Sequence, residues 1–360
     1  MRHPVFAALC AAICLTSAVY TQPSWASGHH KHLVRLYKAV LLEDPATHFP
    51  FSASDLNNRG EVSGAIHASA VGFDVHAAIW RRGQIIRLAE TGATFQSGAH
   101  ALNDVGDVVG DDEEWSVGWG ALWHEGSLSM VGSMEGDFVF WPTRVNNRGE
   151  IVADSNDDGR AYFVVGEGHS WNALEAAPDG ISEHAADINY RSHVVGADVG
   201  PNGARAVLWR DGTVEVLGSL AGMTNSEATG IDAFDRIVGF SSNSQTGMQR
   251  AFLWRHGAMK ELPLLAKGDS TAALAINDWG QIVGREQAAG NVPSRAVLWE
   301  GGRAFDLNAL IYRASTLESH IALRSAFRIN EWGQILASAQ NDPASGDERF
   351  YLLTPVFQWR

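Results

Sequence analysis

Arg250-Ala-Phe-Leu-Trp254-Arg-His-Gly257, with Lys260-Glu-Leu262 and Ala273-Leu-Ala-Ile-Asn277-Asp-Trp-Gly280-Gln-Ile-Val-Gly284 after it, is the clearest copy of a repeated unit that decides the fold. The asparagine of this unit, here called the anchor, recurs at intervals of 46, 43, 43, 43, 45 and 53 residues. The seven anchors are Asn57, Asn103, Asn146, Asn189, Asp232 (in place of Asn), Asn277 and Asn330. A fixed period of about 45 residues is typical of a propeller or a solenoid.

Each unit contains four short strand candidates, separated by turns that contain Gly or Asn. The first ends at the anchor, the second resembles Gln-Ile-Val-Gly, the third resembles Ala-Phe-Leu-Trp, and the fourth ends in Asp-Leu or Glu-Leu. Short strands rich in Val, Ile, Phe and Trp indicate an all-β fold. The repeat therefore predicts a closed seven-bladed β-propeller with four-stranded blades.

Two turns punctuate the unit. In Asn-x-x-Gly the Asn side chain can bond the backbone two residues on, and the Gly can adopt a positive φ at little cost. Ser192 and Asp235 replace this Gly in the fourth and fifth units, so we expect those two turns to be less regular. A second hairpin is indicated by Trp-x-x-Gly, for example from Trp254 to Gly257.

A small residue lies four positions before the anchor in most units. These residues are Ala53, Ala99, Ala185, Ala228, Ala273 and Ala326, with Pro142 in the third unit. A small side chain suits an innermost strand, because the blades crowd together near the axis. The Trp and aliphatic residues of the third strand would then fill the wider space between blades.

The two ends of the repeat region complete the predicted ring. The last unit has no full fourth strand, and the segment from Leu33 to Leu42 has no unit of its own. We expect this segment to pair into the last blade and close the ring, which leaves only short, protected sheet edges. The longest interval, 53 residues before Asn330, leaves room for either a loop or a short helix.

The N-terminus has the pattern of a secretory signal peptide. Arg2 is basic, Val5–Val19 is mostly apolar, and Ser24-Trp25-Ala26 fits a cleavage site. An uncleaved membrane anchor is the alternative, although the apolar run is shorter than the roughly 18 residues that a span needs. The expected organisation is a signal peptide over residues 1–26, a His-rich tail over residues 27–32 and the propeller over residues 33–360. Such a protein would be periplasmic or extracellular.

Composition limits the chemistry and the partners. Both cysteines, Cys10 and Cys14, lie in the predicted signal peptide, so the mature protein would have no disulfide, thiol nucleophile or thiolate metal site. The formal net charge of −14 disfavours nucleic acids and anionic membrane surfaces as partners. It is compatible with basic partners and also with a simple role in solubility. The oligomeric state does not follow from the sequence.

Two third strands carry variants of a His-Ala-Phe signature: His76-Ala77-Ala78-Ile79-Trp80, and Arg250-Ala251-Phe252, which has Arg in place of His. Three further segments near the C-terminus contribute to a resemblance: Phe305–Ile311, Arg328–Ile335 and Phe350–Pro355. On these residues the chain resembles the HAF family of bacterial extracellular repeat proteins over nearly all of residues 40–355. The resemblance implies export and a propeller-like fold, and it implies no particular activity.

The second and third units depart most from the repeat, and departures from a regular pattern are where function is expected. Their loops between the second and third strands are rich in acids and should lie on one face of the propeller. Exposed Trp beside carboxylates can hold a sugar, because the ring stacks on C–H faces while the acids bond hydroxyls. The candidate ligand-binding residues are Asp111, Asp112, Glu113, Trp115, Trp119 and Trp141. The alternative is that the Trp side chains pack between blades.

Two segments could hold a metal ion, although no cofactor is expected. Asp154-x-Asn156-x-Asp158-Gly matches the opening of a calcium loop, but Val165 stands where such a loop has Glu. A solvated hairpin tip is the alternative. Cleavage after Ala26 would expose Ser-Gly-His29, whose amine, amides and imidazole suit Cu(II) or Ni(II).

No catalytic motif decides the function. The sequence contains neither Gly-x-Ser-x-Gly nor His-Glu-x-x-His, so no catalytic residue is assigned. We expect a binding or scaffold module for a glycan or an extracellular protein. A lyase or hydrolase acting on a polysaccharide stays open, because paired carboxylates could act as acid and base. A structural cell-surface protein is the third reading.

Overall fold

The computed structural model describes residues 33–67, 74–91, 96–114, 117–131, 140–155, 158–165, 171–266, 270–287, 293–312, 322–340 and 348–359. The predicted signal peptide and His-rich tail lie outside these residues. The described residues within Leu36–Val356 belong to one compact unit. This unit holds the propeller.

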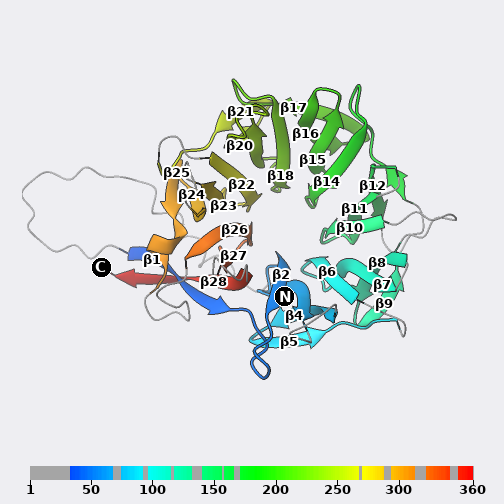
Figure 1. Cartoon of the computed structure of the whole chain (residues 1–360), viewed down its shortest axis with the longest axis vertical. Helices are drawn as coiled ribbons and strands as arrows, with labels where there is room; N and C mark the ends of the chain where they lie inside the picture. The colour runs from blue at the N-terminus through cyan, green and yellow to red at the C-terminus, as the bar shows by residue number, and fades with distance from the viewer. Residues whose placement is uncertain are drawn as a thin grey trace, which may run out of the picture. The chain divides into compact units, whose positions relative to one another are not determined.

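The described residues form seven four-stranded antiparallel sheets arranged as a ring, which confirms the predicted seven-bladed β-propeller (Figure 1). Blade 1 contains β2 (Phe51–Leu56), β3 (Val62–His67), β4 (Val75–Arg81) and β5 (Gln84–Arg87). Blade 2 contains β6 (Gln96–Leu102), β7 (Val108–Glu114), β8 (Val117–His124) and β9 (Ser127–Met130). Blade 3 contains β10 (Phe140–Val145), β11 (Glu150–Ser155), β12 (Ala161–Val165) and β13 (Asn172–Ala173).

The remaining blades repeat this order from the centre outward. Blade 4 contains β14 (Ser182–Ile188), β15 (Val194–Gly200), β16 (Gly203–Arg210) and β17 (Thr213–Gly218). Blade 5 contains β18 (Asn225–Ile231), β19 (Ile237–Ser242), β20 (Gln249–Arg255) and β21 (Ala258–Glu261). Blade 6 contains β22 (Ser270–Ile276), β23 (Ile282–Gln287), β24 (Arg295–Glu300) and β25 (Arg303–Asp306), and the 3-10 helix η2 (Leu307–Leu310) follows it.

Blade 7 closes the ring with strands from both ends of the chain. Its order is β26 (Leu323–Ile329), β27 (Ile335–Gln340), β28 (Glu348–Trp359) and β1 (Leu33–Leu41), as predicted for the N-terminal segment. Beyond β1, the amide of Leu42 donates to the carbonyl of Phe350 over 2.8 Å. Among the described residues, no helix is long and apolar enough to cross a membrane.

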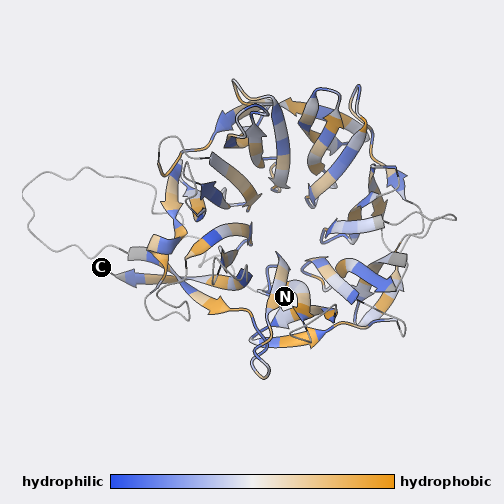
Figure 2. Cartoon of the chain, in the orientation of Figure 1, coloured by the Kyte–Doolittle hydropathy of each residue, from blue (hydrophilic) through white to orange (hydrophobic). Residues whose placement is uncertain are grey.

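Most strands contain both apolar and polar residues, so their ribbons change colour along their length (Figure 2). Apolar side chains of neighbouring blades pack together. One such cluster joins Ala77 and Ile79 of blade 1 to Ala99 and Trp123 of blade 2. The indole of Trp123 also donates to the carbonyl of Ala89 in blade 1 over 2.6 Å. The third-strand Trp therefore fills the space between blades, as the sequence indicates.

Both repeated turns have the expected left-handed residues. In the Trp-x-x-Gly hairpins two successive residues have positive φ, for example Arg82 at 52° and Gly83 at 85°, as a type I′ turn requires. The expectation of irregular turns at Ser192 and Asp235 is wrong. These residues adopt φ values of 68° and 59°, and their amides bond the anchor carbonyl over 3.2 Å, as Gly60 does over 3.1 Å. A polar side chain tolerates this conformation at a turn, so Gly is not required.

The anchor residues link each blade to the next. In six blades the anchor side-chain amide donates to the backbone carbonyl of the following anchor over 2.9–3.0 Å. The last of these bonds, from Asn330 to Asn57, closes the ring. In blade 5 the anchor is Asp232, which has no amide to donate. Arg236 replaces it by bonding the Asp232 carboxylate and donating to the carbonyl of Asp278 in blade 6 over 2.7 Å.

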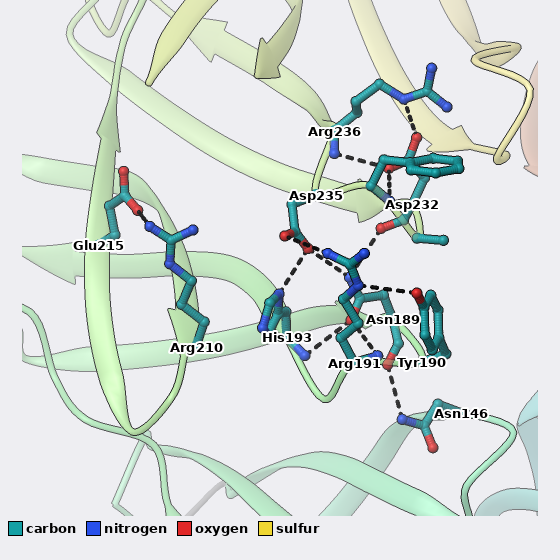
Figure 3. A network of polar contacts seen from close by, with 12 residues as sticks. Asn146, Asn189, Tyr190, Arg191, His193, Arg210, Glu215, Asp232, Asp235 and Arg236 are labelled. Atoms are coloured by element: carbon teal, nitrogen blue, oxygen red, sulfur yellow. Dashed lines mark hydrogen bonds and ion pairs between the residues drawn. The ribbon is translucent and has the colours of Figure 1, made fainter. Parts of the chain in front are cut away.

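Figure 3 shows the part of this anchor ring that runs through blades 3, 4 and 5. Asn146 reaches the carbonyl of Asn189, and Asn189 in turn reaches Asp232 and the carboxylate of Asp235. His193 also bonds Asp235, over 2.8 Å. The anchor ring thus links the ends of the seven inner strands to one another.

Candidate functional site

Every inner strand carries a β-bulge at the same repeat position, three residues before the anchor. The pairing register shifts there in all seven blades. The residues at this position, here called the bulge position, are Ser54, His100, Thr143, Ala186, Thr229, Leu274 and Phe327. A bulge bends its strand and re-aims a side chain. The repeat therefore presents seven side chains of six different kinds at one level of the propeller.

These seven bulge residues line a single cavity of about 410 Å³ at the end of the channel remote from the anchor ring. Its other lining residues are Arg144, His184, Ala185, Glu227 and Arg328. We call this cavity the channel mouth. Every blade contributes to it, so its chemistry is set by seven independent positions in the sequence. Its size suits a small ligand or one or two side chains of a larger one.

His100 is held at both ring nitrogens by acceptors. Its Nε2 lies 2.5 Å from Oδ1 of Asp111, and its Nδ1 lies 2.9 Å from the carbonyl oxygen of Pro142. Burial lowers the pKa of His100, but the hydrogen bond and charge of Asp111 and the Pro142 carbonyl outweigh it, so the pKa is raised. A carbonyl can only accept, and a carboxylate prefers a donor, so the geometry favours the imidazolium form.

His184 forms a second histidine–carboxylate pair, between blades 3 and 4. Its Nδ1 bonds Oδ2 of Asp154, while Oδ1 of Asp154 accepts from the amide of Ala185 over 2.9 Å. The hydrogen bond to Asp154 raises the pKa of His184, although burial opposes it. The His184 side chain is 50% exposed, so it can reach a ligand. Burial raises the pKa of the neighbouring Glu227, and the charge of His184 partly opposes that rise.

Paired charges lie one residue beyond the bulge position. Arg328 of blade 7 donates to Asp55 of blade 1 over 2.9 Å, and Arg144 of blade 3 lies 4.0 Å from Asp187 of blade 4. Burial raises the pKa of Asp187 to about 6, although the charge of Arg144 lowers it. Burial also raises the pKa of Asp55, although the charge of Arg144 again lowers it. Each of the two guanidinium groups therefore has a carboxyl group of the next blade beside it.

The structure places Trp141, a predicted ligand residue, next to the channel mouth. Its ring stacks on that of His100 with centroids 6.5 Å apart and planes at 24°. Its indole Nε1 is buried and has no hydrogen-bond partner among the described residues. Trp141 also pairs in register with Asp154, the partner of His184. It therefore stands between the two histidine–carboxylate pairs.

The other predicted ligand residues of blade 2 are more buried than a binding loop requires. Asp111 supports His100 from β7, and fully buried Asp112 accepts from the amide of Thr91 over 3.0 Å. The carboxylate of Glu113 accepts from Gln96. Trp119 is half-buried in β8, in register with Asp112. Trp115 lies outside the described residues.

The predicted metal ligands do not all lie in the described part of the chain. Asn156 and His29 fall outside it. Asp154 lies on β11 and holds His184, and Asp158 accepts from the hydroxyl of Tyr162 over 2.6 Å and from the amide of Arg160 over 3.1 Å. Both aspartates thus engage protein donors here. Among the described residues no cluster of three or more His, Cys, Asp or Glu could hold a metal ion.

Sequence reasoning found the supporting carboxylates but missed the residues that they support. His100, Arg144, His184 and Glu227 line the channel mouth, and none was a candidate. The repeat did contain a signal. The residue three positions before the anchor varies in chemistry from unit to unit, whereas the residue four positions before the anchor and the anchor itself hardly vary. A variable position between two fixed ones indicates a side chain that faces an open space.

Comparison with known protein families and with curated proteins finds no match. Solved structures of propeller proteins are similar in fold. They include YCF48 bound to D1 peptide, with a TM-score of 0.53 and 12% identity over 88% of this chain and 96% of that one. Virginiamycin B lyase from Staphylococcus aureus has a TM-score of 0.53 and 12% identity, over 90% of this chain and 99% of that one. Acylaminoacyl peptidase from Pyrococcus horikoshii gives 0.56 and 12% over 87% of this chain and 53% of that one. At such identities the similarity shows the fold alone, and the chain is a seven-bladed β-propeller protein.

Proposed function

We propose that this chain is an exported binding module of the HAF repeat type, which holds a carboxylate-bearing segment of a protein ligand in the channel mouth. The observation that carries the proposal is the convergence of seven bulge residues of different chemistry on one cavity. A surface that served only to close the ring would not need different side chains at equivalent positions. The similar propeller YCF48 has been solved with a bound peptide, which supports a protein ligand.

The charge of the channel mouth supports a ligand that carries a carboxylate. His100 is fixed by two acceptors, and the half-exposed His184 bonds Asp154, which raises the pKa of the imidazole. Arg144 and Glu227 are the other charged groups that act on His184. The bulge residue Phe327 adds aromatic surface to the lining, and Trp141 stacks on His100 beside it. Aromatic anchors beside a few polar groups are typical of sites that bind peptides.

Binding to matched peptides tests this proposal. Calorimetry would compare peptides that contain Asp or Glu with the corresponding Asn or Gln peptides. We expect the acidic peptides to bind more tightly, and His184→Ala to weaken binding by about tenfold, as the loss of one charge-assisted hydrogen bond predicts. Lys260→Ala is the matched control, because it also removes a cation but lies exposed on outer strand β21. Equal affinity for the two peptide sets would contradict the proposal.

The pH dependence gives an independent check. The pKa of His184 is raised, so its cationic form persists at higher pH than that of an ordinary histidine. Affinity for the acidic peptide should therefore fall as the pH rises through the raised pKa, at a higher pH than for an ordinary histidine. The His184→Ala variant should lose this dependence. A wild-type affinity that rises with pH would show that His184 does not contact the carboxylate.

A second candidate, an enzyme that cleaves a polysaccharide by hydrolysis or elimination, is favoured by one observation. A half-exposed histidine that bonds a carboxylate, as His184 bonds Asp154, can act as a general acid or base when its pKa lies near the working pH. Incubation with bacterial and plant polysaccharides would show new chain ends if the protein is such an enzyme. Loss of those ends in His184→Ala would assign the role. A folded protein that neither binds nor cleaves would instead be a structural component of the cell surface.

A further inference from the structure

Three large aromatic side chains stand exposed at equivalent positions on adjacent blades. They are Phe234 of blade 5, Trp279 of blade 6 and Trp332 of blade 7, with 60%, 65% and 71% of their surface accessible. Each lies two residues after its anchor, in the turn between the first and second strands. We call this set the aromatic arc. It belongs to the anchor-ring end of the channel, and the channel mouth lies at the other end.

The three turns have the same backbone geometry. In each, the anchor side chain accepts from the amide of the aromatic residue, over 2.8 Å for Phe234, 3.2 Å for Trp279 and 3.1 Å for Trp332. The equivalent residues of the other blades are Arg59, Val105, Arg148 and Arg191. Three neighbouring blades thus present aromatic rings where the remaining four present arginine or valine.

Hydrogen bonds between blades connect the three turns that carry the aromatic arc. The amide of Ala233 donates to Asp278 over 2.8 Å, and the amide of Asp278 donates to the two carboxylate oxygens of Glu331 over 3.1 Å and 3.2 Å. The indole of Trp279 donates to the carbonyl of Glu331 over 2.9 Å, so its only polar atom is already bonded within the protein. The two ring faces are then the part of Trp279 that a ligand can use.

Phe234 is also held in place. The guanidinium carbon of Arg236 lies 5.4 Å from the centroid of its ring, within the range of a cation–π contact. Arg236 is itself fixed by Asp232 and by the carbonyl of Asp278. Rings that are exposed but already oriented lose little conformational freedom on binding. Large apolar side chains clustered on a surface mark a binding site more often than chance.

We propose that the aromatic arc binds a neutral polysaccharide chain. Each ring stands on its own turn, and the side chains between the rings are the carboxylates of Asp278 and Glu331. This alternation of apolar faces and hydrogen-bond acceptors matches a sugar chain, in which every ring has an apolar C–H face and a rim of hydroxyl donors. A protein interface core would need continuous apolar surface with few charges. The carboxylate of Asp278, and that of Glu331 above its pKa of about 7, repel a uronate polymer, so at pH 8 we expect a preference for a neutral chain.

The arc curves over three blades, so the ligand must be extended enough to reach more than one ring. Single sugars should bind much more weakly than oligosaccharides. This inference does not depend on the proposed function of the channel mouth, because the two sites use different residues at opposite ends of the channel. The protein would then hold a polysaccharide on one face and a protein ligand on the other.

Affinity electrophoresis and calorimetry with the full chain test the inference. The probes are neutral glucans, mannans, xylans and galactans, and two uronate polymers, alginate and polygalacturonate. We expect at least one neutral polymer to bind and both uronate polymers to fail. Trp279→Ala and Trp332→Ala should each weaken binding by about tenfold, as the loss of one aromatic contact predicts. Trp279→Phe and Trp332→Phe should keep most of the affinity, because a stacking face remains.

Two control variants separate this site from its surroundings. Val105→Ala changes an exposed apolar residue at the equivalent position of blade 2 and should leave polysaccharide binding unchanged. Lys260→Ala changes an exposed residue of outer strand β21 and should also leave it unchanged. Circular dichroism would confirm that all variants fold, as expected for exposed positions. The inference is overturned if no neutral polymer binds, if the uronate polymers bind as tightly, or if Trp279→Ala with Trp332→Ala retains wild-type affinity.

Discussion

The side-chain amide of the anchor asparagine uses all of its hydrogen-bonding capacity. In blade 1, Oδ1 of Asn57 accepts from the amides of Arg59 and Glu61, and Nδ2 donates to the Glu61 carboxylate and to the carbonyl of Asn103. Two bonds shape the turn, one fixes the start of the second strand, and one reaches the next blade. A buried amide this fully bonded explains why the position hardly varies through the chain.

Blade 5 achieves the same link with different residues, which allows a double-mutant test. Arg236→Gln alone would leave the buried carboxylate of Asp232 without its guanidinium partner and break the bond to Asp278. We expect a loss of about 2–4 kcal/mol in the free energy of unfolding, as for other buried pairs broken from one side. Adding Asp232→Asn should recover most of it, because Asn277 and Gln281 form such a pair in blade 6 over 2.9 Å.

Urea unfolding of the two single variants and the double variant measures this coupling. Asp232→Asn alone should also destabilise, because the amide would face the guanidinium group of Arg236. If the double variant is less stable than Arg236→Gln, the arginine is not a substitute for the missing amide.

Glu331 provides a pH test at the anchor-ring end. Burial raises its pKa to about 7 despite the hydrogen bond from the Asp278 amide, and the charges of Asp278, Asp232 and Asp104 add to the rise. In the unfolded chain the carboxyl ionises at lower pH. Stability should therefore fall as the pH rises from about 4.5 to about 7, because ionisation is harder in the folded state.

Glu331→Gln removes this titration and retains an oxygen that can accept from Asp278. We expect the variant to gain about 1 kcal/mol relative to wild type at pH 8, a value reduced for solvent screening of this half-buried group. At pH 4 the gain should vanish, since the wild-type carboxyl is then neutral in the folded protein. Urea unfolding of both proteins at the two pH values measures this gain. If the variant and wild type differ in stability by the same amount at pH 4 and pH 8, titration of Glu331 is not the cause.

At the scale of the element, the bulge and the glycine opposite it belong together. Gly196 of β15 pairs with Ala185, beside the bulge at Ala186. A Cβ at Gly196 would lie 1.8 Å from the carbonyl oxygen of His184. The same contact would arise at Gly64, Gly110, Gly239 and Gly284, with distances of 1.8–2.0 Å. In these five blades the glycine at the third position of the second strand lets the bulged inner strand approach closely, whereas blades 3 and 7 have Ala153 and Ala337 there.

Gly196→Ala should destabilise the protein by about 1–3 kcal/mol, in the range of overpacked cores, and should move His184 away from Asp154. Gly230→Ala is the matched control. Its added Cβ would lie 3.3 Å from its nearest neighbour, so the backbone would have to move much less than at Gly196. Thermal unfolding gives the stability difference, and proton NMR of His184 reports the bond to Asp154. A Gly196→Ala variant as stable as Gly230→Ala would show that the inner strand can shift without loss.

The strands and their turns are predictable from the sequence, whereas the bulges and the histidine–carboxylate pairs are not. Turn residues and a short apolar run act locally, so the Asn-x-x-Gly and Trp-x-x-Gly spacings predict the strands, the blades and the closing role of Leu33–Leu41. The bulge depends on how two paired strands fit, and local rules do not predict it. Asp111 and Asp154 stood out as acids in the sequence, but their histidine partners lie 11 and 30 residues away. Only the fold brings His184 to Asp154.

At the scale of the whole molecule, the contact between blade 7 and blade 1 differs from every other contact between blades. Asn330 bonds Asn57, and Arg328 bonds Asp55, across 273 residues of chain. The equivalent bond from Asn103 to Asn146 spans 43 residues. The chemistry is the same in both places, but joining the first and last blades requires the loss of far more chain entropy. We therefore expect the ring to close after the other blades have paired.

This order of events predicts different kinetics for two chemically identical substitutions. Asn103→Ala and Asn330→Ala each remove one bond between blades and should lower the free energy of unfolding by a similar amount, about 1–2 kcal/mol. If the closing contact forms after the folding transition state, Asn330→Ala should speed unfolding by about the full tenfold that this loss allows and leave the folding rate unchanged. Asn103→Ala should divide its effect between the two rates. Stopped-flow fluorescence in urea measures both rates through the many Trp residues. If both variants divide the loss of stability between the folding and unfolding rates in the same way, the first blade is already joined to the last in the transition state.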